Sequence, residues 1–183
     1  MTRTMCAAVT MGIAAGMALP AAGEMATRRW GTPPDPSPAP GALTAARGPR
    51  TAAPTGYAIP TTDAPAIDAK LDDKAWAAAP AMILARTLDG SARAAVSTEV
   101  RAVQDGKRLY LAIRCQEPQA DKLRAERRGH DGPVWSDDSV EVFLGFGSAY
   151  WHFGVNAAGS TYDGQAKDGS WNSGLEAAAA RGQ

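Results

Sequence analysis

The sequence predicts an all-β protein, an antiparallel β-sandwich of the jelly-roll or immunoglobulin-like kind. Short segments rich in Val, Ile, Tyr and Trp recur from residue 66 onward, and several alternate between apolar and polar residues. Gly, Asp and Pro separate these segments at close spacing. There is no internal repeat, so one sandwich, typically of about 100 residues or more, accounts for residues 66–183.

Length and charge set the limits of the prediction. The chain has 183 residues and a formal net charge of zero. This length suffices for one ordinary domain with a tail. The balanced charge gives no support to binding of nucleic acid or of a membrane surface, because both require a basic patch.

The first 23 residues are typical of a secretory signal peptide. Arg3 supplies a short basic region, residues 6–19 are apolar and small, and residues 20–23 offer small side chains to a signal peptidase. A membrane anchor is the alternative, but the apolar run is shorter than the about 20 residues that cross a bilayer. We therefore expect a secreted or periplasmic protein with no membrane contact after cleavage.

Only two cysteines are present, Cys6 and Cys115. Because Cys6 lies in the predicted signal peptide, the mature chain would retain Cys115 alone, without an intrachain disulfide. We expect Cys115 to pack as a small apolar residue.

Residues 24–65 are predicted to be a disordered linker rich in Pro and Ala. Nine prolines fall in this stretch, with almost no large apolar residues between them. Such a segment cannot bury enough surface to offset the entropy lost on ordering. A semi-extended tether to the folded domain is expected.

Patterned sequence begins with IDAKLDDKAWAAAP, residues 67–80. Two aspartates precede Trp76 and Pro80 follows it, which predicts an extended lead-in and a short helical turn with Trp76 in the core.

A β-hairpin is predicted next. STEVRAVQ (97–104) and LYLAIRCQE (109–117) flank Asp105-Gly106, and Gly accepts the positive φ that such a turn requires. Alternation divides the second strand into two faces: Leu109, Leu111, Ile113 and Cys115 on one, and Tyr110, Ala112 and Arg114 on the other. A polar loop (118–133) follows, in which KLRAERR is expected to form a helical turn.

The segment VWSDDSVEVFLGF, residues 134–146, is predicted to be a strand with one buried face. Val140, Val142 and Leu144 would point inward, and Glu141 and Phe143 outward. If the next strand, residues 150–156, pairs antiparallel to it, Trp151, Phe153 and Val155 also face the core. His152, Gly154 and Asn156 then lie on the face of Glu141.

This outer face is the candidate binding site. Trp135, Glu141 and Asn156 would form a polar patch with an aromatic wall, and such a patch suits a sugar, whose hydroxyls pair with polar groups while its apolar face lies on the indole. Simpler structural roles remain open. Trp135 would close the sandwich edge, Glu141 would pair with Arg101 or Arg114, and Asn156 would start a turn.

Four motifs in order carry a resemblance to a known family: IDAKLDDKAW, TEVRAVQDGKRLYLAIRCQEP, VWSDDSVEVFLGF and YWHFGVNAAGSTYD. Over residues 66–176 they resemble the family 9 carbohydrate-binding module and its relatives, most strongly in W-x-x-D-S-V-E-x-F, which begins at Trp135. The resemblance implies a β-sandwich that binds the ends of sugar chains without catalysis, attached to an exported glycan-degrading enzyme of polysaccharide catabolism. It implies that Trp135 stacks on the sugar while Glu141 and Asn156 hydrogen-bond to it.

The chain departs from the family pattern in two places. An arginine of the binding members falls at Gly154 here, and their second tryptophan belongs to a later loop that residues 66–183 do not contain. We therefore expect the last strands of the sandwich to be missing. Binding members also carry structural calcium.

Glycosidase activity is an alternative to sugar binding. Asp137 and Glu141, four residues apart on one strand, would be separated by roughly 13 Å, whereas a glycosidase places its two carboxyls about 5 to 9.5 Å apart. Enzymatic activity of this domain is therefore not expected.

Metal and haem sites are the remaining alternatives. The carboxylates Asp131, Asp137, Asp138 and Asp163 are of the kind that calcium uses, but no spacing resembles a known calcium loop, which favours a solvated acidic loop. His130 and His152 are too few for a zinc site. Related sandwich domains bind haem through Met and His or Lys, and Met82, His130 and His152 are available, although no haem-attachment motif is present. A purely structural or protein-binding module is a further alternative.

Overall fold

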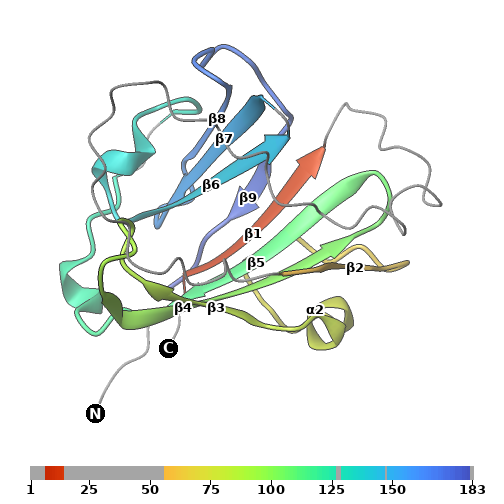
Figure 1. Cartoon of the computed structure of the whole chain (residues 1–183), viewed down its shortest axis with the longest axis horizontal. Coiled ribbons are helices and arrows are strands. Elements are labelled where there is room, and N and C mark those ends of the chain that lie inside the picture. The colour runs from red at the N-terminus through yellow and green to blue at the C-terminus, as the bar shows by residue number, and fades with distance from the viewer. Residues whose placement is uncertain (1–6, 15–55, 127–128, 147, 182–183) are drawn as a thin grey trace, which may run out of the picture. The chain divides into compact units, whose positions relative to one another are not determined.

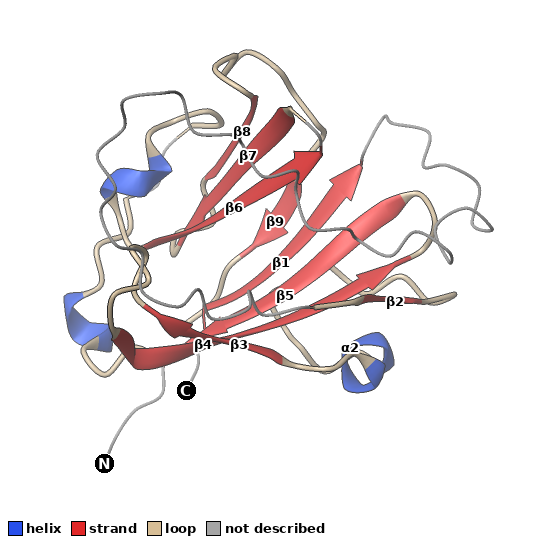
Figure 2. Cartoon of the chain, in the orientation of Figure 1, coloured by secondary structure: helices blue, strands red, loops and turns tan. Residues whose placement is uncertain are grey.

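Two β-sheets face each other across an apolar interior, as Figures 1 and 2 show. The computed structural model describes residues 7–14, 56–126, 129–146 and 148–181. Leu111 and Ile113 of one sheet pack with Phe153 and Val155 of the other, and all four are buried. The predicted antiparallel β-sandwich is confirmed.

The larger sheet has six strands, with β2, β4, β5, β1 and β9 in this order and β3 also paired with β4. Their bounds are β1 Ala7–Ala14, β2 Ala58–Pro60, β3 Met82–Arg86, β4 Arg93–Gln104, β5 Arg108–Cys115 and β9 Glu176–Ala178. Strand β4 is long enough to pair with β3 along its first part and with β2 along its last three residues.

The hairpin of β4 and β5 forms as predicted, with Thr98 opposite Cys115 and Gln104 opposite Leu109. At the turn Gly106 has φ +84°, a conformation that favours glycine. Asp105 holds the turn together, because its Oδ1 accepts hydrogen bonds from the N–H groups of Lys107 and Arg108 at 2.8 and 2.7 Å.

Both faces of β5 are covered, as the alternation predicts. Leu109, Leu111, Ile113 and Cys115 belong to the interior between the sheets. Tyr110 and Ala112 pack on the opposite face with Trp76 of the short helix α2, Lys74–Ala78. Arg101 fastens this helix to the sheet, since its guanidinium donates to the carbonyl oxygens of Trp76 and Ala79, both at 3.0 Å.

The smaller sheet contains β6 Ser139–Phe146, β7 Ala149–Asn156 and β8 Thr161–Gln165, all antiparallel. Glu141 lies opposite Gly154, and Phe143 lies opposite His152. Val140, Val142, Leu144 and Trp151 turn toward the interior with Phe153 and Val155. The inward and outward faces predicted for residues 139–156 are confirmed.

Two short 3₁₀ helices precede the smaller sheet. The first, η1, spans Ala120–Lys122. The helical turn predicted for KLRAERR, residues 122–128, is wrong for its described part, because residues 123–126 are not helical. The second, η2, spans Val134–Ser136 and lies directly before β6, so the predicted strand starts at Ser139 rather than at Val134.

Two strands, β1 and β2, lie in the segments predicted to be a signal peptide and a linker. The backbone of β1, within the predicted signal peptide, pairs along its length with β5 and at three positions with β9. Residues 56–65 were assigned to the linker, yet β2 pairs parallel with β4, so ordered structure begins before residue 66. Residues 15–55 lie outside the described part, and removal of a signal peptide stays a prediction. No helix in the described part has the length and apolar character needed to cross a bilayer.

Candidate functional site

Four ring side chains gather on the outer face of the smaller sheet. His152 stacks on Phe143 with ring centroids 4.2 Å apart and planes 11° from parallel. Trp135 lies 6.1 Å from His152 and meets Tyr162 edge-on at 5.1 Å, and His152 lies 5.0 Å from Tyr162. We call this group, Trp135, Phe143, His152 and Tyr162, the aromatic face.

Strand alternation and one glycine produce the aromatic face. Phe143 and His152 are paired across β6 and β7, and Tyr162 of β8 lies opposite Gly154. Because Gly154 has no side chain, Val134 of η2 packs into the space above it, where a Cβ would stand 2.6 Å from Val134 Cγ2. Val134 is completely buried in this position, and the next residue, Trp135, is thereby held over the sheet.

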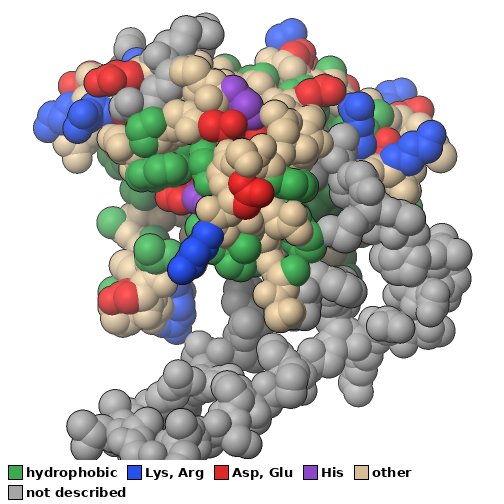
Figure 3. Space-filling model, turned by 90° about the horizontal axis from the view of Figure 1, so that it is seen from above, with side chains coloured by type: hydrophobic (Ala, Val, Ile, Leu, Met, Phe, Trp, Pro, Cys, Tyr) green, Lys and Arg blue, Asp and Glu red, His purple; other side chains and the backbone are tan. Residues whose placement is uncertain are grey.

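Glu141 provides the polar side chain of this face. Its Oε2 lies 2.8 Å from His152 Nε2, and this contact aligns the carboxylate with the ring that stacks on Phe143. The predicted ion pair of Glu141 with Arg101 or Arg114 is wrong for Arg101, whose Nε donates to Glu99 at 2.7 Å. In the space-filling view the two histidines lie apart, each beside an acidic side chain (Figure 3).

Much of the aromatic face is open to solvent. Trp135 is 48% exposed and Phe143 is 60% exposed. An exposed patch of aromatic surface beside a fixed carboxylate is unusual unless it meets a ligand or partner. The aromatic planes offer stacking surface, while Glu141 offers hydrogen-bond acceptors to a polar ligand.

Asn156, the third residue predicted for the site, lies elsewhere. Its side chain is 0% exposed. The amide Nδ2 donates to the Glu126 carbonyl at 2.8 Å and to Asp137 Oδ2 at 2.9 Å. Its Oδ1 accepts from the N–H groups of Ala158 and Ser160 at 3.0 and 2.9 Å. All four hydrogen-bonding positions of the amide are used inside the protein, so in this conformation Asn156 organises a turn and offers nothing to a ligand.

The structure therefore brings Trp135 and Glu141 together through His152 and leaves Asn156 out. Strand alternation predicts Phe143 and His152 on the face of Glu141, and the predicted site adds Trp135 to this face; the ring contacts of His152 with Phe143 and Trp135 are a finding of the structure. Tyr162 was missed entirely, because it belongs to β8, a strand whose only sequence signals are its flanking turns.

The two neighbouring aspartates are engaged in local structure. Asp138 Oδ2 accepts from the N–H of Arg124 at 2.7 Å, and Asp137 Oδ2 accepts from the N–H of Glu126 at 3.2 Å as well as from Asn156. Asp137 and Asp138 therefore tie the loop before η2 to the start of β6. Glu141 contacts a different residue, His152, on the outer face.

Three residues outside the aromatic face form a cluster of possible metal ligands. One ligand atom from each of His130, Asp131 and Asp163 lies within 4.8 Å of the others. Calcium, which the family resemblance implies, takes six to eight oxygen ligands. This cluster offers one nitrogen and two carboxylates, so it does not fit calcium. Asp163 is fully buried, and the prediction of a solvated acidic loop is wrong for this residue.

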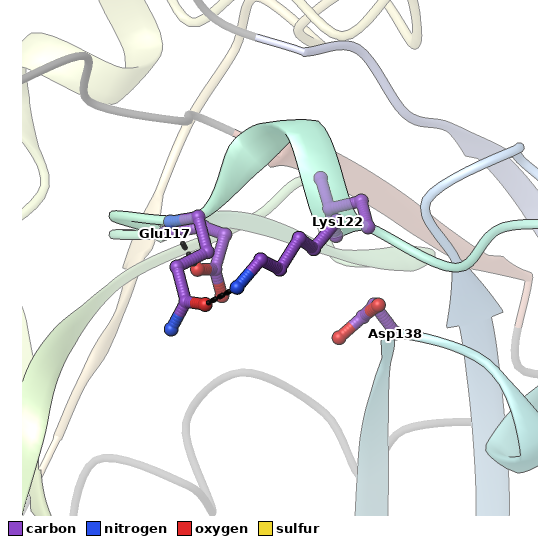
Figure 4. Close-up of a pocket in the computed structure, with 5 residues that line it drawn as sticks. Glu117, Lys122 and Asp138 are labelled. Carbon is purple, nitrogen blue, oxygen red and sulfur yellow. Dashed lines mark hydrogen bonds between the residues drawn. The ribbon is translucent and has the colours of Figure 1, made fainter.

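A polar hollow lies near η1, and Figure 4 shows Lys122 extending across it toward the side of Glu117, with Asp138 on the other side. Its volume, about 190 Å³, is below the roughly 300–1,000 Å³ of typical small-molecule sites. Lys122 Nζ donates to Gln119 Oε1 at 2.8 Å, and Glu117 Oε1 accepts from the Gln119 N–H at 2.6 Å. The hollow contains none of the residues of the aromatic face.

The residues considered for haem are not brought together. Met82 packs against the interior between the sheets. His152 lies on the outer face of the smaller sheet with Phe143, and His130 belongs to the metal-ligand cluster. The Met82 and His152 side chains thus lie on opposite sides of the smaller sheet.

These features define a β-sandwich with an aromatic, partly polar face on its smaller sheet. The chain belongs to the carbohydrate family 9 binding domain-like family, whose model matches residues 67–180. The predicted resemblance is confirmed, and the family indicates carbohydrate binding in general by a domain of a typically non-catalytic kind. No curated protein and no solved structure matches the chain.

Proposed function

We propose that the protein binds a glycan chain on the aromatic face and has no catalytic role of its own in this domain. The observation that carries this proposal is the half-exposed Trp135 beside exposed Phe143, with Glu141 fixed next to them by His152. Family membership supports a carbohydrate as the ligand.

The chemistry of the face suits a pyranose ring. The axial C–H groups of a sugar form an apolar surface that lies flat on an indole, and its hydroxyls donate to a carboxylate at the edge. Trp135 would carry the stacking, and Glu141 would accept one or two hydroxyl hydrogen bonds. Since His152 already contacts Oε2, the carboxylate is held in one orientation before the ligand arrives, which lowers the entropy lost on binding.

We further propose that the protein is exported and serves as an accessory module that brings a glycan-degrading activity to polysaccharide. The basic, apolar and small-residue regions of the first 23 residues support export. Once residues 1–23 are removed, the proline-rich stretch before β2 would begin the chain and suit a tether between modules.

A glycan array probed with the full chain tests the proposed function. We expect binding to a restricted set of glycans, strong loss with Trp135→Ala and weaker binding with Glu141→Gln. The matched control is Tyr57→Ala, which removes an exposed aromatic ring away from this face. A folded protein that binds no glycan, or one that binds equally well after both substitutions at the face, contradicts the proposal.

A further inference from the structure

His130 is held with one ring nitrogen facing two carboxylates. Its Nδ1 lies 2.9 Å from Thr161 Oγ1. Its Nε2 lies 3.1 Å from Asp163 Oδ1, 3.5 Å from Asp131 Oδ1 and 3.2 Å from Asn172 Nδ2. Because Asn172 Oδ1 accepts from the N–H of Gly174 at 2.9 Å, its amide is oriented with the NH₂ group toward the histidine. Nε2 is thus the ring nitrogen that faces the two carboxylates. In the tautomer with the proton on Nδ1, its lone pair can bind a cation.

Asp163 gives an independent sign that a cation belongs here. Its side chain is completely buried. The Oδ2 atom accepts a hydrogen bond from the N–H of Ser173, but Oδ1 receives no hydrogen bond. A buried carboxylate oxygen without a donor is costly unless a positive charge faces it. The atom that it does face, at 3.1 Å, is Nε2 of His130, which supplies a positive charge only when the imidazole is protonated.

Asp131 Oδ1 is the third ligand atom of the group. Asp131 Oδ1 accepts a long contact, 3.5 Å, from the N–H of Asp163 and lies on the same side as the other two atoms. Nε2 lies 3.1 Å from Asp163 Oδ1 and 3.5 Å from Asp131 Oδ1, close to the roughly 3.3–3.6 Å between ligands that hold one tetrahedral cation at about 2.0–2.2 Å each.

We propose that His130, Asp131 and Asp163 bind a divalent transition-metal cation of the Zn²⁺ type, with a further position open to water. A nitrogen ligand and a set of only three side chains favour Zn²⁺ over calcium, which prefers more ligands and oxygen alone. The hydrogen bond between Nδ1 and Thr161 is the outer contact that orients a metal-binding imidazole. The cation replaces the Asn172 contact at Nε2, and partly exposed His130 gives it a path from solvent.

This site is separate from the aromatic face and does not depend on the proposed function. The cation would tie the loop containing His130 and Asp131 to β8 through Asp163. Its binding free energy then adds to the stability of the folded chain, because the three ligands are brought together only on folding.

Calorimetric titration of the chelator-treated full chain with ZnCl₂ tests the site. We expect one Zn²⁺ per chain and a higher melting temperature with Zn²⁺, with weaker binding of CaCl₂. His130→Gln and Asp131→Asn change partly exposed ligands and should each weaken Zn²⁺ binding by about 10-fold or more. The control is His152→Gln, since His152 also contacts a carboxylate, that of Glu141, but lies outside the cluster.

Several results would overturn the proposal. Wild-type protein that is folded but binds no Zn²⁺ indicates that a protonated His130 satisfies Asp163 instead. If His130→Gln binds Zn²⁺ as tightly as the wild type, the metal is bound elsewhere. The same holds if His152→Gln loses as much Zn²⁺ affinity as His130→Gln. Tighter binding of Ca²⁺ than of Zn²⁺ contradicts the ligand chemistry.

Discussion

The side chain of Val134 occupies the space that a Cβ of Gly154 would need, since the two carbon atoms would be only 2.6 Å apart. Val134 is completely buried, so it cannot move aside at low cost. This contact fixes η2 on the sheet and, with it, the position of Trp135. The glycine falls where binding members of the family have an arginine, and here that place is filled by Val134.

Gly154→Ala should therefore disturb both stability and the aromatic face. We expect a loss of about 1–3 kcal/mol in the free energy of unfolding, because the added methyl group overpacks a filled site. Displacement of η2 should also weaken glycan binding. Urea unfolding and calorimetric glycan titration measure the two effects.

Gly145→Ala is the matched control, since Gly145 lies on the same strand pair and a Cβ there meets nothing within 4 Å. Equal stability of the two variants would show that Val134 and Gly154 do not constrain each other.

Asn156→Ala separates a structural role from a binding role. The substitution removes the hydrogen bonds that the amide makes with the N–H groups of Ala158 and Ser160 and with the Glu126 carbonyl. Each lost hydrogen bond costs about 0.5–1.5 kcal/mol, so the melting temperature should fall clearly. At a temperature where the variant is folded, its glycan affinity should equal that of the wild type. A large loss of affinity at unchanged stability would restore Asn156 to the binding site.

The comparison of Asn156 with Glu141 shows where reasoning from the sequence succeeds and where it stops. Alternation along β6 and β7 correctly predicts which residues share a face, because the period of a strand is fixed by backbone geometry. It does not predict that Glu126 and Asp137 come to contact the Asn156 side chain, since these contacts join segments far apart in the sequence. For the same reason the sequence does not predict the cluster of His130 and Asp131 with Asp163, which lies more than 30 residues further along the chain.

The turn of the β4–β5 hairpin should make stability depend on pH. Burial alone raises the pKa of Asp105, but hydrogen bonds from the N–H groups of Arg108 and Lys107 and from the Tyr110 hydroxyl outweigh it, so the pKa is lowered. A carboxyl with a lowered pKa in the folded state stabilises the fold above its unfolded pKa of about 3.9 and loses this effect as the pH falls through the folded pKa.

Asp105→Asn should accordingly destabilise the protein near neutral pH and differ little from the wild type in strong acid. Urea unfolding at several pH values measures the difference. Asp72→Asn, at an exposed position outside the turn, is the control. A stability difference that is independent of pH would contradict the role of the Asp105 charge.

Strand β1 leads to a prediction about the N-terminus. It lies between β5 and β9, with eight paired positions along β5 from Ala7 opposite Cys115 to Ala14 opposite Arg108. A chain that starts at residue 24, which cleavage of the proposed signal peptide would produce, lacks this strand and exposes the edge of β5. A cleaved signal peptide and a structural β1 are therefore alternative roles for these residues. We expect lower stability, at roughly 0.5–1.5 kcal/mol for each ladder hydrogen bond lost, and self-association through the open edge. Thermal unfolding and light scattering compare the two chains, and a shortened chain that is equally stable and monomeric would contradict this role of β1.

The central claim is that Trp135 forms the stacking surface of a glycan site. Calorimetric titration with the strongest glycan from the array tests it directly on wild type, Trp135→Ala and the exposed-aromatic control Tyr57→Ala. Aromatic stacking against a ligand commonly contributes on the order of 1–3 kcal/mol, so the account predicts a loss of about 10-fold or more for Trp135→Ala and none for Tyr57→Ala. Unchanged affinity of a folded Trp135→Ala variant would contradict the account.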